Sequence, residues 1–260
     1  MRLLFIGDIV GSGGRRFLID CLPDLQTRFR PDVCLANVEN AAAGKGITSL
    51  LAKKLHASGI NLMTLGNHAF ARQELLDSID SLPFLVRPLN VPSAWPGREY
   101  AVHQAAAGTV IVINLLGRVF MDPVNDPFGP TIPFLEELKE RYRTRLVVVD
   151  FHAEATAEKI AFSTYMDGHC TLVAGTHTHV QTADERIMKL GTAAITDVGM
   201  TGPIDGVIGM DSQSSLRRFV DHLPAPYEVA AGPVQLNAVF VEADPVSGRA
   251  VHIERIQINE

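Results

Sequence analysis

The sequence is short of cysteine, of long apolar runs and of positive charge, and each shortage excludes a class of protein. Its 260 residues contain three cysteines, an odd and widely spaced set that suits buried thiols of a cytoplasmic protein better than a disulfide framework. No stretch reaches the ~20 apolar residues that a membrane helix requires. The apolar N-terminal run stops at Gly7 and Asp8, too early for a signal peptide. We therefore expect a cytoplasmic protein without a membrane partner.

The balance of charge excludes duplex nucleic acid as a partner. Lys and Arg number 23 against 29 Asp and Glu, which gives a net charge of −6, and no segment carries a basic run. Because phosphate neutralisation by Lys and Arg dominates binding to a duplex, this composition argues against it. Hydrophobic residues make up 47% and charged residues 20%, as in ordinary globular proteins. No linker divides the chain, so we expect a single domain over residues 1–260.

Three common nucleotide-binding or catalytic motifs are also missing. The glycine-rich segment 11–14 has Arg16 where a dinucleotide-binding fingerprint requires its third glycine, and it lacks the Gly-Lys-Ser/Thr of a P-loop. We interpret this segment as a flexible turn. No serine stands in a nucleophile-elbow context. Lys45 lies between two glycines and is interpreted as a solvated loop lysine.

Hydrophobic periodicity predicts strands that alternate with helices in the first two thirds of the chain. A long excursion over 199–234 follows, with an amphipathic helix at 211–223 that we interpret as a lid or an oligomer contact. The chain closes with a β-hairpin of strands 235–243 and 249–258. This order predicts sheets covered by helices and leaves the oligomeric state open. The other predicted strands are 3–6, 33–38, 61–65, 109–116, 146–151, 170–174 and 192–196, and the other helices are 15–29 with a kink or break at Pro23, 49–58 capped by Thr48, 72–82, 132–142 and 156–166.

Potential metal ligands follow five of the predicted strands. In the segment 175–179, with the sequence GTHTH, the two histidines are two residues apart and can face one point. Such a pair alone fits a solvated loop equally well. However, the carboxyl ends of parallel strands line one crevice in α/β proteins, so residues distant in sequence converge there. The sequence therefore predicts a shared metal site with the candidate ligands Asp8, Glu39, Asn40, Asn67, His152, His177 and His179.

The number and type of these candidates favour two metal ions. Seven ligands exceed the three or four protein ligands of one catalytic zinc. Nitrogen and oxygen donors without a thiolate suit iron, manganese or zinc. Two such ions ~3.5–4 Å apart activate a hydroxide and stabilise both oxygens of an in-line displacement at phosphorus. The pattern thus predicts hydrolysis of a phosphoester.

Several sequence blocks resemble a known family. The segment 66–68 (GNH) and the segment 175–179 are similar to the GNH and GHxH signatures of the calcineurin-like metallophosphoesterases. The segments 7–11 (GDIVG), 38–42 (VENAA), 151–154 (FHAE) and 199–203 (GMTGP) resemble the YmdB-like bacterial branch, so the resemblance covers nearly the whole chain. It implies an α/β/β/α sandwich of two mixed sheets flanked by helices. It also implies a phosphodiesterase that opens 2′,3′-cyclic nucleotides with two metal ions, for which iron is expected and manganese or zinc stay open.

The resemblance also implies a role for each residue. Glu39 would bridge the two ions, and a hydroxide between them would attack the phosphorus of a small nucleotide diester. His68 would act as the general acid that protonates the departing 2′-oxygen and leaves a 3′-nucleotide. The implied ligands are Asp8, Asn40 and His179 on the first ion, and Asn67, His152 and His177 on the second.

The chain departs from the superfamily pattern at two places. Val10 stands where most members carry a histidine two residues after the first Asp, so Asn40 would replace that ligand. Residues 69–71 (AFA) lack the acidic residue that often follows the Asn-His pair, so the support of His68 is undefined. Two rival functions stay open. One is a phosphomonoesterase that uses the same site, and the other is a regulatory or RNA-associated protein with a structural or ligand-sensing metal site.

Overall fold

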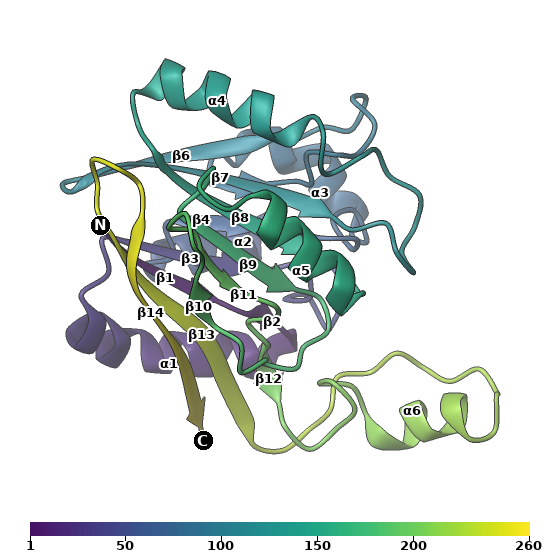
Figure 1. The fold of residues 1–260 in the computed structure, drawn as a ribbon. Coiled ribbons are helices and arrows are strands. Elements are labelled where there is room, and N and C mark those ends of the chain that lie inside the picture. Colours follow the sequence, from purple (N-terminus) through teal and green to yellow (C-terminus); the bar gives the residue numbers. More distant parts are fainter.

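Two mixed β-sheets lie face to face and carry helices on their outer faces (Figure 1), in a computed structural model that describes residues 1–260. The strand order of the larger sheet is β2 (Asp8–Ile9), β12 (Met200–Pro203), β13 (Val234–Ala243), β1 (Arg2–Ile6), β3 (Val33–Asn37), β4 (Leu62–Thr64) and β5 (Leu85–Val86), with β14 (Ala250–Asn259) also paired to β13. The order of the smaller sheet is β10 (Arg186–Ile187), β11 (Ala193–Ile195), β9 (Leu172–Thr176), β8 (Leu146–His152), β7 (Gly108–Leu116) and β6 (Tyr100–Ala105).

The central strands of each sheet are parallel. β1, β3 and β4 run parallel in the larger sheet, with Leu4 opposite Cys34. β7, β8 and β9 run parallel in the smaller sheet, with Val149 opposite Val173. Every residue of β3, β8 and β9 is buried, because a parallel strand is covered on both faces. The antiparallel hairpin of β13 and β14 confirms the predicted C-terminal strands.

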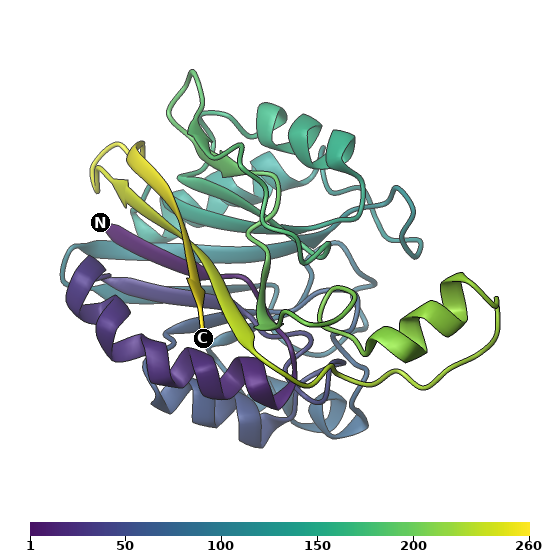
Figure 2. The same cartoon turned by 90° about the horizontal axis from the view of Figure 1, so that it is seen from below.

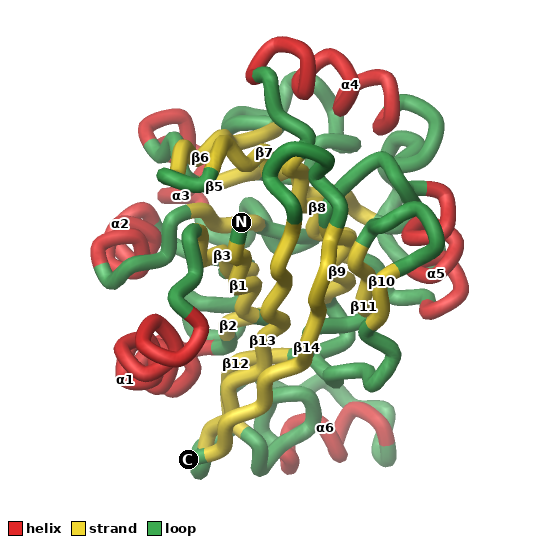
Figure 3. Tube along the Cα trace, turned by 60° about the vertical axis from the view of Figure 1, so that its left-hand side comes forward, coloured by secondary structure: helices red, strands yellow, loops and turns green.

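The helices α1 to α5 divide between the two outer faces, as Figure 3 shows. α1 (Gly11–Phe29), α2 (Ser49–Ala57) and α3 (Gln73–Ser78), which continues in a short 3₁₀ turn (Ile79–Ser81), cover the larger sheet. α4 (Thr131–Tyr142) and α5 (Thr156–Tyr165) cover the smaller sheet. A third apolar layer, with Phe5 and Val148, fills the space between the sheets. This arrangement confirms the predicted sandwich. No helix is both long and apolar enough to span a membrane.

The interpretation of the glycine-rich segment 11–14 as a flexible turn was wrong, because it forms the first turn of α1. A Cβ on Gly14 would lie 2.1 Å from the carbonyl oxygen of Thr201, so the missing side chain lets the helix pack closely on β12. Pro23 does not interrupt α1. It lies on the exposed face, where water can satisfy the carbonyl that loses its partner.

Other predicted boundaries shift by a few residues. Thr48 caps α2 as predicted, since its hydroxyl accepts a hydrogen bond from the amide of Leu51 at 3.3 Å. β6, which pairs with β7 in antiparallel orientation, was not predicted.

All three cysteines are free thiols; Cys34 and Cys170 are buried and Cys21 is half-buried. The excursion contains β12 and α6 (Ser212–Phe219), and Figure 2 shows α6 projecting from the sandwich.

Candidate metal centre

Strand ends of both sheets meet at one point in the structure. Glu39 lies two residues after β3, His152 ends β8, and His177 follows β9. The Nε2 atom of His152 is 3.1 Å from Oε1 of Glu39 and 3.0 Å from Nδ1 of His177. The ligand atoms of the three residues all lie within 4.8 Å of one another. This spacing is compatible with three ligands of one cation.

The other predicted ligands surround this group. Oδ1 of Asn67 is 2.9 Å from Nε2 of His152. On the other side, Nδ2 of Asn40 is 3.2 Å from Oε1 of Glu39 and 3.1 Å from Nε2 of His179. Glu39 therefore stands between two groups of side chains. The assignment of each group to its own metal ion stays a prediction.

Asp8 joins the group through the histidine loop. Its Oδ1 atom is 4.0 Å from Nε2 of His179, and its Oδ2 atom accepts a hydrogen bond of 3.2 Å from the amide of His177. The structure thus brings together all seven side chains that the sequence suggested as ligands.

The loop that carries His177 and His179 has an unusual backbone. Their φ angles are 100° and 67°, in the left-handed region that residues other than glycine seldom adopt. Asp197 holds this loop, because its carboxylate accepts hydrogen bonds from the amide and the hydroxyl of Thr178 at 3.1 and 2.7 Å. Lys159 balances the buried charge of Asp197 with an ion pair of 2.6 Å. A buried ion pair therefore supports the turn between the two histidines.

The hydrogen bonds of the outer ring nitrogens fix which nitrogen of each histidine faces the centre. The Thr176 hydroxyl donates to Asp150 at 2.6 Å, so its oxygen accepts from Nδ1–H of His152 at 2.9 Å. Nε2 of His152 then faces the centre. The carbonyl of Ile208 can only accept, so His179 donates to it from Nδ1 at 2.8 Å and keeps Nε2 for the centre.

The third imidazole completes this arrangement. Nε2 of His177 is 3.2 Å from a carboxylate oxygen of Glu154, which leaves Nδ1 directed at the centre. Ligating histidines in metal sites are usually oriented by such a hydrogen bond from the other ring nitrogen. The three rings therefore present three inward nitrogens.

The centre has an excess of acceptors over donors. Oδ1 of Asp8 and Oδ1 of Asn40 are buried and have no hydrogen-bond partner. Two inward imidazole nitrogens face each other at 3.0 Å beside the carboxylate of Glu39. Buried acceptors without a partner are costly, and a cation would satisfy them together. The mixed nitrogen and oxygen donors fit a transition metal ion.

The pKa shifts of these groups reflect burial and the close approach of carboxylates and histidines. Burial raises the pKa of Asp8 to about 6. Burial alone would also raise the pKa of Glu39, but His152 and His68 outweigh it and lower the value to about 2. The pKa of His152 rises to about 9 because Glu39, Asp8 and Asp150 outweigh the opposing effect of burial. A proton on Nε2 of His152 and a metal ion compete for the same position.

His68 lies beside the centre with its ring free. Its backbone amide donates to Oε2 of Glu39 at 2.8 Å, and no side-chain hydrogen bond engages the imidazole. The ring is half-buried, and burial lowers its pKa. His68 is thus held by its backbone next to Glu39 while its side chain stays available.

The sequence reasoning missed the residues that orient the ligands. Asp150 is a charged residue inside the otherwise apolar β8, and it lies two positions before His152 on the same side of the strand. Asp197 follows β11, so it ends a strand as the predicted ligands do. The sequence therefore contained a signal for Asp150 and for Asp197. Lys159 and Thr176 gave none, because a helix lysine and a strand threonine are common.

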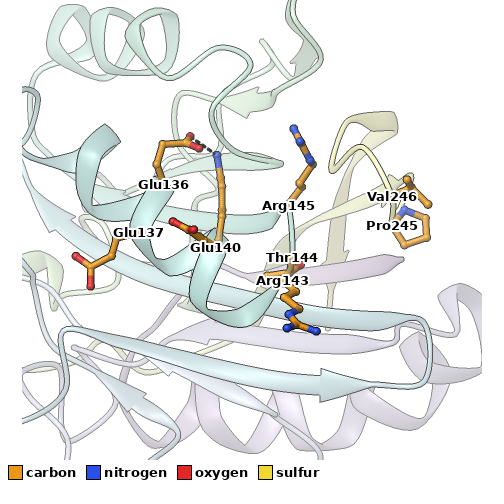
Figure 4. Close-up of a pocket in the computed structure, with 9 residues that line it drawn as sticks. Glu136, Glu137, Glu140, Arg143, Thr144, Arg145, Pro245 and Val246 are labelled. Atoms are coloured by element: carbon orange, nitrogen blue, oxygen red, sulfur yellow. Dashed lines mark hydrogen bonds and ion pairs between the residues drawn. The ribbon is translucent and has the colours of Figure 1, made fainter.

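The charged cavity at the C-terminal end of α4 is separate from the centre. It measures about 650 Å³ and includes Arg143, Arg145 and the turn between β13 and β14. Figure 4 shows its charged side chains pointing in different directions, with a single ion pair of 2.8 Å between Glu136 and Lys139. None of the predicted ligands lines this cavity. It therefore does not belong to the candidate metal centre.

Comparisons with known proteins agree on one family. The chain matches the family described as YmdB-like protein over residues 4–256. It is 46% identical over 260 residues to the 2′,3′-cyclic-nucleotide 2′-phosphodiesterase of Bacillus subtilis strain 168, covering 100% of this chain and 98% of that protein.

Solved structures extend the comparison to the fold. A hypothetical protein from Thermus thermophilus superposes with a TM-score of 0.91 at 38% identity, covering 100% of both chains. A novel phosphatase from Mycoplasma pneumoniae gives a TM-score of 0.91 at 35% identity, covering 100% of this chain and 93% of that one. The calcineurin-like phosphoesterase YfkN of Bacillus subtilis shares the fold at a TM-score of 0.59 and 11% identity, covering 99% of this chain and 90% of that one. The chain therefore belongs to the YmdB-like protein family and has the fold of the calcineurin-like phosphoesterases.

Proposed function

We propose that this protein is a metal-dependent phosphodiesterase that hydrolyses 2′,3′-cyclic nucleotides to 3′-nucleotides. The observation that carries the proposal is the convergence of three inward imidazole nitrogens and two partnerless buried oxygens on the carboxylate of Glu39. The substrate class follows the name of the Bacillus subtilis relative, which is 46% identical to this chain over 260 residues.

The ligand groups on either side of Glu39 suit two ions. Glu39 would be shared, and iron is the expected metal, although manganese and zinc accept the same donors. When bound, two such ions supply a nucleophile from water at neutral pH and neutralise charge on the transferring phosphoryl group. We assign Asp8, Asn40 and His179 to one ion, and Asn67, His152 and His177 to the other.

The protein's own contribution is to orient these groups and to move a proton. The Thr176 and Asp150 chain holds His152 in one tautomer, and the Asp197 carboxylate holds the loop that carries the other two histidines. His68 would donate its ring proton to the departing 2′-oxygen, since its side chain is free and its backbone is fixed on Glu39.

The rival enzyme is a phosphomonoesterase, as the description of the Mycoplasma pneumoniae structure suggests for that protein. Protein loaded with iron, manganese or zinc separates the two when it is assayed on 2′,3′-cyclic AMP and on p-nitrophenyl phosphate. Our proposal predicts faster turnover of the cyclic diester, with 3′-AMP as the product in chromatography. Preference for the monoester, or release of 2′-AMP, would contradict it.

Two variants test the proposed roles in the same assay. Glu39→Gln removes the shared carboxylate, and His68→Ala removes the proton donor; a general acid typically contributes about 10²- to 10⁴-fold to the rate. His169→Ala is the matched control, because this histidine is partly exposed and its contact is with Glu136 on α4. Turnover that survives both site substitutions, or that matches the metal-stripped protein, would favour a structural or ligand-sensing site.

A further inference from the structure

The excursion after β12 forms an arm, residues 204–232, that begins beside the candidate metal centre. Figures 1 and 2 show the arm with α6 projecting from the sandwich before the chain returns as β13. At the base of the arm, the amide of Ile204 donates to the carbonyl of Pro233 at 2.9 Å, and Met210 forms isolated bridges with Val207 and Val229. The carbonyl of Ile208 holds the ring of His179. The base of the arm is thus attached to the centre.

A cavity of about 170 Å³ lies within this arm. Its lining includes Ile208, the residue whose carbonyl orients His179, together with Phe219 and Tyr227. These three side chains stay exposed in the ligand-free protein, at 46%, 73% and 45% of their surfaces. Neighbouring exposed aromatic and aliphatic side chains beside a polar centre indicate a contact surface for a partly apolar ligand.

Tyr227 is an aromatic side chain of the cavity whose ring is held by a neighbouring charge. Its hydroxyl has no hydrogen-bond partner in the protein, while the guanidinium of Arg218 lies 5.4 Å from its ring centroid and limits the orientation of the ring. Burial raises the pKa of Tyr227, and the negative charge of Glu39 raises it further. Ile208 lines the same cavity as Tyr227, and its carbonyl accepts a hydrogen bond from His179 at 2.8 Å, so the cavity adjoins the metal centre.

We propose that the cavity in the arm is the base subsite of the enzyme, where Tyr227 stacks on the nucleobase of the substrate. A 2′,3′-cyclic nucleotide carries its base on the same ribose as its cyclic phosphate. A phosphate at the metal centre therefore leaves the base one sugar ring away, and the cavity of the arm adjoins the centre at Ile208. The proposal rests on the proposed function and adds the part of the molecule that recognises the nucleoside. Stacking accepts any base, so the subsite should favour large purines over small pyrimidines.

The test compares substrates with and without a base. Tyr227→Leu removes the aromatic ring, and Tyr227→Phe keeps it. Leu216→Ala is the control, because Leu216 is 55% exposed on α6 but does not line the cavity. With 2′,3′-cyclic AMP, we expect Tyr227→Leu to lower kcat/KM by about 5- to 100-fold, mainly through KM, as the loss of one stacking contact implies. With methyl p-nitrophenyl phosphate, a diester that lacks a base, kcat/KM should not change. Tyr227→Phe and Leu216→Ala should behave as the native protein on both substrates.

The outcomes separate this proposal from the one on which it rests. If the native protein does not hydrolyse 2′,3′-cyclic AMP, the proposed function fails and the base subsite fails with it. If the native protein hydrolyses it and Tyr227→Leu affects both substrates equally, the base subsite is overturned while the function stands. Sedimentation of each variant gives a second readout. Equal loss on both substrates with an altered oligomeric state would identify the arm as an interface between copies of this chain.

Discussion

The hydroxyl of Thr176 is predicted to set the metal affinity of the centre, although it does not reach the metal position. Thr176→Val keeps the shape of the side chain and removes one oxygen. That oxygen accepts from Nδ1 of His152 at 2.9 Å and donates to Asp150 at 2.6 Å. Without it, the imidazole loses the hydrogen bond that fixes its tautomer. We expect metal affinity to fall by about 10- to 100-fold, the range found for residues that orient a ligand.

The effect on folding follows from the same two contacts. The substitution leaves Nδ1 of His152 and Oδ1 of Asp150 buried without their partner, and each such group costs about 1–3 kcal/mol. The free energy of unfolding should therefore fall by roughly 2–6 kcal/mol. Urea unfolding of the metal-free protein measures this loss, and competition with a fluorescent chelator measures the affinity for Mn²⁺.

Thr64→Val is the matched control. The buried hydroxyl of Thr64 donates to the other oxygen of Asp150 and does not contact His152. We expect this variant to lose stability but to keep its affinity for Mn²⁺. If Thr176→Val binds Mn²⁺ as tightly as the native protein, or if both variants lose affinity equally, the hydroxyl of Thr176 does not set the metal affinity through His152.

Three further predictions concern charge and space around the centre. Nearby carboxylates outweigh burial and raise the pKa of His152 from the ordinary value of 6.5 to about 9. The charged imidazole should therefore contribute roughly 3 kcal/mol to the stability of the metal-free protein. This contribution is complete below pH 6.5 and is lost as the pH rises through 9. Urea unfolding at pH 6, 8 and 10 checks this, and constant stability across the series would contradict it. Lys159→Met leaves Asp197 buried without its ion pair and should lower the free energy of unfolding by about 3–5 kcal/mol; a loss under about 1 kcal/mol would show that the pair is not a support. Gly66→Ala places a methyl group 2.6 Å from Nε2 of His152 and should abolish metal binding. Gly129→Ala, whose added methyl group meets Asp126 and none of the predicted ligands, should bind metal normally in the same chelator assay.

The grouping of the seven candidate ligands could be predicted from the sequence, because strand ends are readable from hydrophobic runs. β3, β8 and β9 each begin with an apolar run, and the polar residues at and after their ends stand out. The parallel order of these strands then brings the ends together, as the distances around Glu39 show. The element boundaries and the segment 11–14 were less readable, because close packing of α1 on β12 decides them.

The orienting residues could not be predicted in the same way. The contact of Thr176 with Asp150 depends on the register between β9 and β8, which places His152 opposite Thr176. The pairing of Lys159 with Asp197 joins a helix to a strand end 38 residues later. Such contacts arise from tertiary packing and leave no periodic signal in the sequence.

We propose that two groups of ligands on either side of Glu39 hold two metal ions that support diester hydrolysis. Elemental analysis of manganese-loaded protein, with turnover of 2′,3′-cyclic AMP measured on the same samples, tests it directly. We expect about two ions per native chain and about one in each of His177→Ala and His179→Ala, with turnover lost in both. A native chain that turns over the substrate with no bound metal, or with a single ion that both substitutions leave in place, would contradict it.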